Sequence, residues 1–509
     1  MSPMPFCPRV SLFLLLLVSG VIPGFLSSVM AQQAARPNII LVLVDDMGWS
    51  DPGCYGGEIE TPNLDRLAAE GLRFSQFYNC AKCETTRATL LSGRYHAEVG
   101  VAKLQRCATL AEVLAGAGYQ TWMTGKWHLS GNPLDRGFGQ YFGHLSGATN
   151  FFTGDGTFRV NREVFEVPEQ GFYTTDANTD YAIQFIRERD RERPFFLYVA
   201  HNAPHYPLQA PKEDVMKYRG TYKEGWDQLR VERLERIRGM GLLPETAELS
   251  IRPEDVSDWH ELSEKEHDQH DLVMATYAAM IDRVDTNMGR LVQCLQDENE
   301  YERTLILFLS DNGACPFQRT TPQTLEGPLM PWDPESYWTY DQRWAHACNT
   351  PFRAYKRNQH EGGIRTPMIA HWPQGLANPG TITHQPGHIV DMMATFIELG
   401  AARYPPVDAP REDAPREPGP LRGSSLVPIF RGEERADVGA RFFTFYGTHN
   451  AVRVGDLKLV NRDKGPWELY DLARDPIEAN NLIERQSQRA KPLIEQWEAW
   501  ARTVKIKRK

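Results

Sequence analysis

The sequence lacks several features that mark particular classes of protein. It has no internal repeat and no long basic stripe, and its net charge is −10, which argues against a nucleic-acid partner. Beyond the N-terminus, no apolar run approaches the roughly 20 residues of a membrane-spanning helix, so we expect no stable membrane span. The 509 residues are 41% hydrophobic and 24% charged, which indicates a globular chain longer than one ordinary domain.

Cysteines are few, and their spacing supports no structural zinc site. Cys80 and Cys83 form a single C-x-x-C, whereas a zinc site of this kind needs a second pair. A redox role is poorly supported too, because such motifs usually open a helix in a smaller, thioredoxin-like fold. A disulfide from Cys80 to Cys83 or to Cys107 stays open, because sequence cannot show proximity.

The first 31 residues have the pattern of a secretory signal. Arg9 supplies the only charge before Arg36, residues 10–22 are almost entirely apolar, and small residues lead to Ala31. The alternative is an uncleaved anchor, but the apolar run is shorter than a membrane span. We therefore expect cleavage near Ala31 and a periplasmic or secreted protein.

Strand and helix signals alternate through most of the remaining chain. Residues 38–44 and 305–309 are continuous apolar runs, typical of strands buried on both faces of a parallel sheet. Apolar residues spaced three and four apart over 273–295 predict a long amphipathic helix. Further helices are expected from Thr61 (as the cap) to Gly71 and over 109–117 and 178–190, and strands over 119–124 and 195–199. The pattern predicts an α/β fold with a large layered sheet.

Three segments interrupt this alternation. Residues 212–270 are rich in charge and are expected to run over the surface, and residues 318–348 carry Trp332, Trp338 and Trp344 with little periodicity. These tryptophans either pack or stack on a sugar ring. Residues 401–423 include a proline-rich stretch typical of a linker. We therefore expect a catalytic domain over 36–400 and a smaller α+β subdomain over 424–509, with strand signals at 441–459 and a helix at 485–504.

Acidic residues follow two of the predicted strands. Asp45-Asp46 comes directly after the first, and Asp311-Asn312 directly after the strand at 305–309. Ligands of open α/β sheets lie at the carboxyl ends of strands, so these residues are expected to meet in one crevice. Their oxygen atoms suit a hard divalent cation, Ca²⁺ or Mg²⁺. The alternative for each pair taken singly is a simple turn.

Seven motifs, in order along the chain, resemble those of the formylglycine-dependent sulfatases. The central one, CETTRATLLSGR from Cys83 to Arg94, resembles the family's C-x-P-x-R followed by a small-residue helix. The others are VDDMGWSDPGCYGG (44–57), TPNLDRLAAEG (61–71), TGKWHL (124–129), APHYPLQAP (203–211), LSDNG (309–313) and YKRNQHEGGIRTP (355–367). The resemblance covers nearly all of the mature chain. It implies a mixed, mostly parallel sheet sandwiched by helices, as in alkaline phosphatase, and a second domain at the C-terminus.

The resemblance also implies the chemistry of sulfate ester hydrolysis. A formylglycine-generating enzyme would oxidise Cys83 in the unfolded chain, and one hydroxyl of the hydrated aldehyde would attack the sulfur of a sulfated small molecule or glycan. The alcohol leaves, and the second hydroxyl releases sulfate as the aldehyde re-forms. One Ca²⁺ would be bound by residue 83 with Asp45, Asp46, Asp311 and Asn312.

The remaining site residues are likewise assigned by resemblance. Arg87 would contact residue 83 and the metal-site carboxylates, and His205 the leaving-group oxygen. Sulfate oxygens or the diol would be held by Lys126, His128 and Lys356. Taken singly, each lysine or histidine is more often a solvated or structural residue.

Thr85 departs from the family pattern, which has proline or alanine at that position. Threonine lacks the fixed φ of proline and adds an N–H, so the modifying enzyme is expected to bind this stretch less well. We expect partial conversion of Cys83, or a modifier that tolerates threonine.

Two other functions compete with the sulfatase interpretation. A formylglycine-type phosphonate or phosphate ester hydrolase is compatible with the same residues, whereas a two-zinc phosphoesterase would have Asp-His in place of Asp311-Asn312 and Thr or Ser in place of Cys83. The second is a sulfatase-like binding protein in which Cys83 stays a thiol.

Overall fold

The computed structural model describes residues 36–405, 419–436, 440–445 and 448–504. The predicted signal segment and most of the proline-rich stretch lie outside the described residues. The chain from Arg36 onward forms one compact unit. In the part of the chain that the structure describes, no helix combines the length and apolarity needed to cross a membrane.

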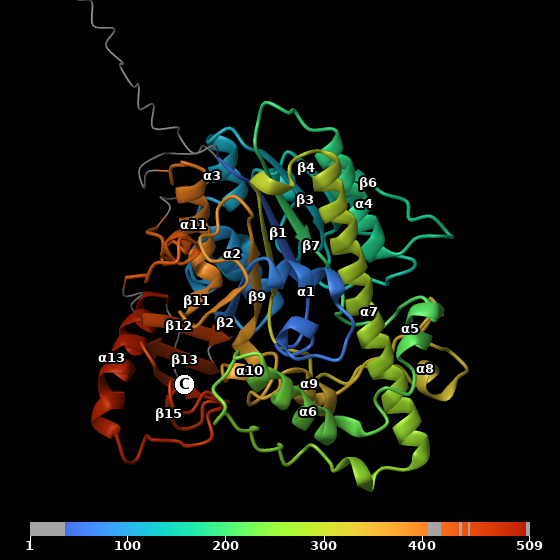
Figure 1. The fold of residues 1–509 in the computed structure, drawn as a ribbon, viewed down its shortest axis with the longest axis vertical. Coiled ribbons are helices and arrows are strands. Elements are labelled where there is room, and N and C mark those ends of the chain that lie inside the picture. Colours follow the sequence, from blue (N-terminus) through green and yellow to red (C-terminus); the bar gives the residue numbers. More distant parts are fainter. Residues whose placement is uncertain (1–35, 406–418, 437–439, 446–447, 505–509) are drawn as a thin grey trace, which may run out of the picture. The chain divides into compact units, whose positions relative to one another are not determined.

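A mixed sheet of eleven strands forms the centre of this unit (Figure 1). Its order is β10-β2-β9-β8-β1-β7-β3-β4-β5-β6, with β11 also paired to β2. The strands are β1 (Asn38–Val44), β2 (Leu72–Tyr78), β3 (Gln120–Gly125), β4 (Gln140–His144), β5 (Phe158–Val160), β6 (Glu163–Val164), β7 (Phe195–Ala200), β8 (Thr304–Ser310), β9 (Arg365–His371), β10 (Thr381–Thr383) and β11 (Gly387–His388). All four strands predicted in this region are confirmed to within one residue at each end.

The four central strands, β8, β1, β7 and β3, are parallel to one another. Every residue of β1 is buried, because helices cover the sheet on both faces. Ile40 and Val42 belong to one core, and Ile39 and Leu41 to the other. The continuous apolar run of β1 is what such a position requires, and the predicted α/β fold is confirmed.

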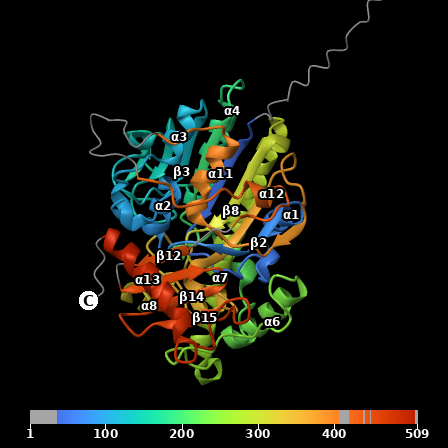
Figure 2. The same cartoon turned by 90° about the vertical axis from the view of Figure 1, so that its left-hand side faces the viewer.

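Figures 1 and 2 show the two helical layers on either side of the sheet. One layer contains α1 (Pro62–Ala69), α4 (Thr174–Arg187) and α7 (Glu264–Asp297), and the other α2 (Cys83–Ser92), α3 (Leu110–Gly116), α11 (Met392–Leu399) and α12 (Val427–Phe430). The predicted stripe lies on α7, which begins nine residues earlier because Ser263 and Glu266 form a capping box. The helix expected at residue 178 likewise begins at Thr174.

The cap predicted for α1 is wrong in one respect. Thr61 is the N-cap residue, but its side chain makes no capping hydrogen bond. Instead, Asp285 of α7 accepts hydrogen bonds from the backbone N–H groups of Asn63 (3.1 Å) and Leu64 (2.7 Å). The helix start is therefore held by a residue more than 200 positions away.

The segment 212–270 is not only a surface excursion, which corrects the prediction. It forms α5 (Lys212–Tyr218) and α6 (Gly225–Gly239), and Trp226 is buried among other aromatic rings. The Arg233 side chain is fully buried between Asp51 at 2.7 Å and Glu58 at 2.9 Å. Buried charges are tolerated when they are paired, and charge content alone therefore does not predict exposure.

Residues 318–348 contain α8 (Pro322–Glu326) and α9 (Gln342–Cys348), and Trp338, Tyr340 and Trp344 belong to the same core as α1, α4 and α7. Trp344 is fully buried, and Trp338 donates its indole N–H to the carbonyl oxygen of Leu329 at 3.2 Å. Of the three tryptophans, only Trp332 is partly exposed. Packing, rather than stacking on a sugar, is therefore the role of Trp338 and Trp344.

The C-terminal part is a four-stranded antiparallel sheet with one long helix. The strands β12 (Ala440–Phe445), β13 (His449–Val454), β14 (Leu457–Asn461) and β15 (Glu468–Asp471) pair in sequence order, and α13 (Ser487–Thr503) packs on them. Arg453 of this sheet donates a hydrogen bond to the Tyr78 hydroxyl of β2 at 2.6 Å. The predicted α+β arrangement of this region is confirmed.

Candidate active site

The loops after the four central strands emerge at one edge of the sheet. Val44 of β1 pairs with Ser310 of β8, and Gly125 of β3 pairs with Ala200 of β7, so these strands end at matching positions. The next residues are Asp45-Asp46, Asp311-Asn312, Lys126 and the loop that carries His205. The expectation that the two acidic pairs share a crevice is confirmed.

Three buried oxygen atoms at this edge have no hydrogen-bond partner within the described residues. They are Oδ1 of Asp45, Oδ2 of Asp46 and Oδ1 of Asn312. The Asn312 amide donates to Asp46 Oδ1 at 2.6 Å, and the Asp46 N–H donates to Asp311 Oδ1 at 3.3 Å. Because an unsatisfied buried oxygen is costly, and carboxylate and amide oxygens are the ligands of hard cations, this set fits a divalent metal ion.

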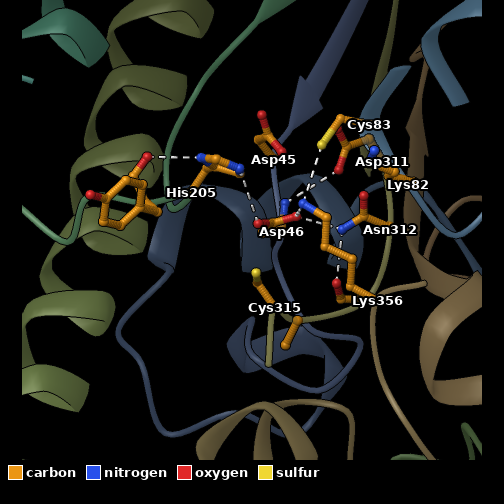
Figure 3. A network of polar contacts seen from close by, with 12 residues as sticks. Asp45, Asp46, Lys82, Cys83, His205, Asp311, Asn312, Cys315 and Lys356 are labelled. Carbon is orange, nitrogen blue, oxygen red and sulfur yellow. Dashed lines mark hydrogen bonds and ion pairs between the residues drawn. The ribbon is translucent and has the colours of Figure 1, made fainter. Parts of the chain in front are cut away.

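Cys83 faces the acidic residues from the first position of α2 (Figure 3). Its Sγ lies 3.2 Å from Lys356 Nζ. Ligand atoms of Cys83, Asp45, Asp46 and His205 all lie within 4.8 Å of one another. The thiol is 2% exposed, and burial followed by the charge of Asp45 raises its pKa. The start of α2 also directs backbone N–H groups toward any anion bound beside residue 83.

Arg87 lies one helical turn after Cys83 and is completely buried. Its guanidinium donates to Asp311 Oδ2 at 3.2 Å, to Asp45 Oδ2 at 3.5 Å and to the carbonyl oxygen of Lys126 at 2.8 Å. One side chain thus connects three of the four strand ends.

Acidic and basic groups balance in this cluster. The acids are Asp45, Asp46 and Asp311, and the bases are Arg87, Lys126 and Lys356, with Lys126 paired to Asp45 and Lys356 to Asp46. Burial opposes ionisation of Asp45, but Lys126 and His205 hold its pKa well below the usual value. Burial and the neighbouring Asp45 raise the pKa of Asp311 to about 8. A divalent cation would make the cluster net positive, which suits an anionic substrate.

Two histidines border the cluster, His128 from the loop after β3 and His205 from the loop after β7. His205 donates its Nδ1–H to the carbonyl oxygen of Tyr206 at 2.8 Å, and its Nε2 lies 3.5 Å from Asp46 Oδ2. His128 groups with Cys83 and Glu84 as a second set of possible ligand atoms. Burial, with Lys126 next, lowers the pKa of His128, and burial lowers that of His205 to about 4.

The structure brings every predicted site residue into this cluster and adds two that sequence reasoning did not select. Glu84 is buried and pairs with Lys82 at 2.6 Å, and Cys315 lies in the loop after β8 near Asp46. The sequence signal for each was its position beside a motif: Glu84 directly follows Cys83 in CETTR, and Cys315 ends the stretch DNGAC.

The disulfides that the sequence left open are absent from the described residues, where all seven cysteines are free thiols. Cys80 is buried, and its Sγ instead donates to Thr89 Oγ1 at 3.3 Å.

Comparison with known proteins shows the family of this chain. The sulfatase family model matches residues 37–401. The chain belongs to the sulfatase family. A second model, described as the C-terminal part of N-sulphoglucosamine sulphohydrolase, matches residues 353–500 of this sulfatase. The protein is accordingly a sulfuric ester hydrolase with the alkaline-phosphatase-like fold.

Individual sulfatases resemble it over most of their length. An uncharacterised sulfatase of Schizosaccharomyces pombe is 32% identical, over 91% of this chain and 93% of its own. The arylsulfatase of Klebsiella aerogenes is 30% identical, over 80% of this chain and 94% of its own. The solved structure of Ps i-CgsB in complex with k-i-k-neocarrahexaose superimposes with a TM-score of 0.66 at 26% identity, over 92% of this chain and 93% of that one.

Proposed function

We propose that this sulfatase is an exported, calcium-dependent enzyme that hydrolyses sulfate monoesters through a formylglycine at position 83. One observation carries the proposal: Cys83 lies beside Lys356 and three buried oxygen atoms that have no hydrogen-bond partner among the described residues. We assign residues 36–400 to the catalytic domain and 424–509 to a C-terminal subdomain, with a signal segment cleaved near Ala31.

The calcium ion would be held by residue 83 with Asp45, Asp46, Asp311 and Asn312. When bound, it would neutralise sulfate charge and act as a Lewis acid toward the formylglycine hydrate, whose hydroxyl is the nucleophile. Arg87 keeps Asp45 and Asp311 oriented through the two contacts described above.

The basic side chains would bind the sulfate group. Lys126 contacts Asp45, and Lys356 contacts Asp46. Both lysines are buried, so their side chains lose little conformational entropy when an anion binds. His128 would contact a sulfate oxygen or the diol. His205 would contact the leaving-group oxygen through Nε2, because its Nδ1 is already bonded to Tyr206.

The names of the relatives support a substrate class. One is named an arylsulfatase, and Ps i-CgsB is described in complex with a neocarrahexaose. We therefore propose aryl or carbohydrate sulfates as substrates, and a formylglycine-generating enzyme as the partner that modifies Cys83 before folding.

Mass spectrometry of the peptide containing residue 83 tests the nucleophile. Trypsin would leave only CETTR, so a different protease is used. Protein from the native host should carry an aldehyde or its hydrate at position 83, and a Cys83→Ala variant should have no activity on 4-nitrophenyl sulfate. An unmodified thiol in active protein would refute the formylglycine assignment.

Chelation tests the metal. Treatment with EGTA should lower both the melting temperature and the activity of the modified enzyme, because the three buried oxygens again lack a partner. Ca²⁺ should restore both. Full activity after complete removal of calcium, checked by metal analysis, would refute the metal assignment.

A further inference from the structure

The imidazole of His128 packs against a glycine from a different loop. A side-chain carbon added at Gly147 would lie 2.5 Å from His128 Nε2, 2.9 Å from Cδ2 and 3.0 Å from Cε1. All three distances are shorter than an ordinary van der Waals contact, which begins at about 3.5 Å. Among the glycines of the described residues, Gly147 is the one whose added side chain would first meet a predicted site residue. Only a residue without a side chain fits beside the ring.

Backbone conformation does not explain why this residue is a glycine. The φ of Gly147 lies outside the left-handed region, so alanine could adopt the same backbone. The atoms that an alanine methyl group would meet belong to the end of a side chain, which can rotate. We therefore expect the folded chain to accommodate alanine by displacing the His128 ring. The cost of the substitution would fall on the position of that ring and not on stability.

The backbone next to His128 is held by the same part of the chain. His128 has a φ of 54°, in the left-handed region that residues other than glycine seldom adopt. The N–H of Trp127, the residue before it, donates to the carbonyl oxygen of His144 at the end of β4, at 3.0 Å. Gly147 follows three residues later. Both the backbone and the ring of His128 thus contact the chain that leaves β4.

A hydrogen-bonded cluster around Asp155 fixes the loop that carries Gly147. One carboxylate oxygen of Asp155 accepts from the Ser146 hydroxyl at 2.5 Å, and the other accepts from the N–H and the hydroxyl of Thr157, at 2.7 and 2.5 Å. The Thr157 hydroxyl oxygen in turn accepts from the N–H groups of Leu145 at 3.1 Å and Ser146 at 3.2 Å. The loop cannot move away from His128 without breaking these hydrogen bonds.

We propose that Gly147 is a positioning residue for His128 and that Asp155 holds Gly147 in place. This inference rests on the proposed function, in which His128 contacts a sulfate oxygen or the diol. A ring nitrogen of His128 lies within 4.8 Å of Cys83 Sγ, so a small displacement of the ring changes its contact with the group bound there. Because Gly147 acts through the imidazole, its effect on catalysis exists only while the imidazole is present.

A double-mutant cycle tests the proposal, with activity on 4-nitrophenyl sulfate divided by the fraction of formylglycine. Gly147→Ala should lower kcat by about tenfold or more, because a misplacement of about 1 Å can cost about 100-fold. The melting temperature should change little. In a His128→Ala background, Gly147→Ala should leave kcat unchanged, since the space of the missing ring takes up the methyl group.

Asp155→Ala should act in the same direction through the loop. It should lower kcat in the wild-type background and leave kcat unchanged in His128→Ala, although it lowers the melting temperature in both because hydrogen bonds are lost. A crystal structure of Gly147→Ala gives a readout besides activity. It should show the His128 ring displaced and the backbone of residues 144–148 unchanged.

Gly289→Ala is the matched control. A carbon added at Gly289 of α7 would lie 2.7 Å from Oδ1 of Asn63, so it too meets the end of a side chain, but one outside the active site. This variant should have the kcat of wild type.

The outcomes separate this proposal from the proposed function. Wild-type kcat in Gly147→Ala, or a loss by the same factor with and without the His128 ring, would overturn the positioning role. A crystal structure in which the loop shifts and the ring keeps its place would overturn it as well. If enzyme with a verified formylglycine hydrolyses neither aryl nor carbohydrate sulfates, the proposed function is overturned, and the crystal structure of Gly147→Ala still decides whether the glycine positions the ring.

Discussion

Lys356 connects the nucleophile position with the oxygen cluster. Its ammonium group contacts both Cys83 and Asp46, and Asp46 in turn holds its pKa well above the usual value despite burial. Lys356→Met should lower kcat/KM on 4-nitrophenyl sulfate by about 100-fold or more, because a buried cation directed at developing negative charge is lost. Activity within a few-fold of wild type, in protein with the same extent of formylglycine, would contradict this role.

Thr85 occupies a position where proline would fit the helix. It lies in the first turn of α2, where a backbone N–H has no helical acceptor, and its hydroxyl donates to the carbonyl oxygens of Cys80 (2.9 Å) and Lys82 (2.8 Å). Thr85→Pro should therefore fold, at a cost of about 1–2 kcal/mol for the two lost hydrogen bonds. Mass spectrometry should show an equal or larger fraction of formylglycine.

Thr86→Pro is the control for that substitution. The Thr86 N–H donates to the carbonyl oxygen of Lys82 at 2.9 Å, so proline there removes a helical hydrogen bond and should destabilise the protein. Lower conversion in Thr85→Pro than in wild type would show that threonine does not limit modification.

Single residues of the site were predictable where a motif fixes their spacing. Asp45, Arg87 and Lys356 are spread over about 300 residues of the chain, and only the resemblance, together with the rule that ligands bind at strand ends, places them together. Glu84 was not selected because it occupies an unspecified position of the C-x-P-x-R motif, and Cys315 was not selected because it lies just outside the LSDNG motif.

Between elements, Asp285 fixes the position of α1 on α7. Its carboxylate accepts from Asn63 and Leu64, and burial raises its pKa to about 6. Asp285→Asn should lower the free energy of unfolding by about 1–3 kcal/mol at pH 4, because an amide cannot accept from all three donors.

The same substitution should have a defined pH dependence. Because the pKa in the folded protein is above the ordinary value near 4, the stability that this group contributes is complete below that value and is lost as the pH rises through about 6. Denaturant unfolding of both proteins between pH 4 and 7 should show a difference that shrinks with rising pH. A difference that grows would contradict the shift.

Elements were predictable where apolar spacing is strong. The stripe on α7 and the apolar runs of β1 and β8 identified those elements correctly, because the residues buried in each element are apolar and can be recognised in its own sequence. The high charge of segment 212–270 predicts an exposed surface. Several of its charged side chains are instead buried in ion pairs, as Arg233 is with Glu58, and the sequence does not show which charged residues pair.

Across the whole molecule, a buried ionic cluster joins the C-terminal sheet to the site loop. Lys458 of β14 lies 2.8 Å from Glu361 and 2.8 Å from Glu478, and all three side chains are fully buried. Glu361 begins the short helix α10 (Glu361–Ile364), five residues after Lys356. The C-terminal sheet therefore supports the segment that carries a predicted catalytic lysine.

Lys458→Met is the counterpart of Lys356→Met, since both remove a fully buried lysine. It should lower the free energy of unfolding by about 3–5 kcal/mol, because two carboxylates lose their buried partner. At a temperature where the variant is still folded, kcat/KM should stay within about threefold of wild type. A 100-fold loss with an unchanged melting temperature would place Lys458 in the chemistry instead.

The burial of Cys83 fixes when the proposed modification can take place. A thiol that is 2% exposed in the folded chain is out of reach of another enzyme, so the proposed conversion must be finished before the sheet and α2 close around it. A molecule that folds before conversion retains an unmodified Cys83 thiol. The specific activity of a preparation is then a record of the modifier present during synthesis, and later addition of that enzyme cannot raise it.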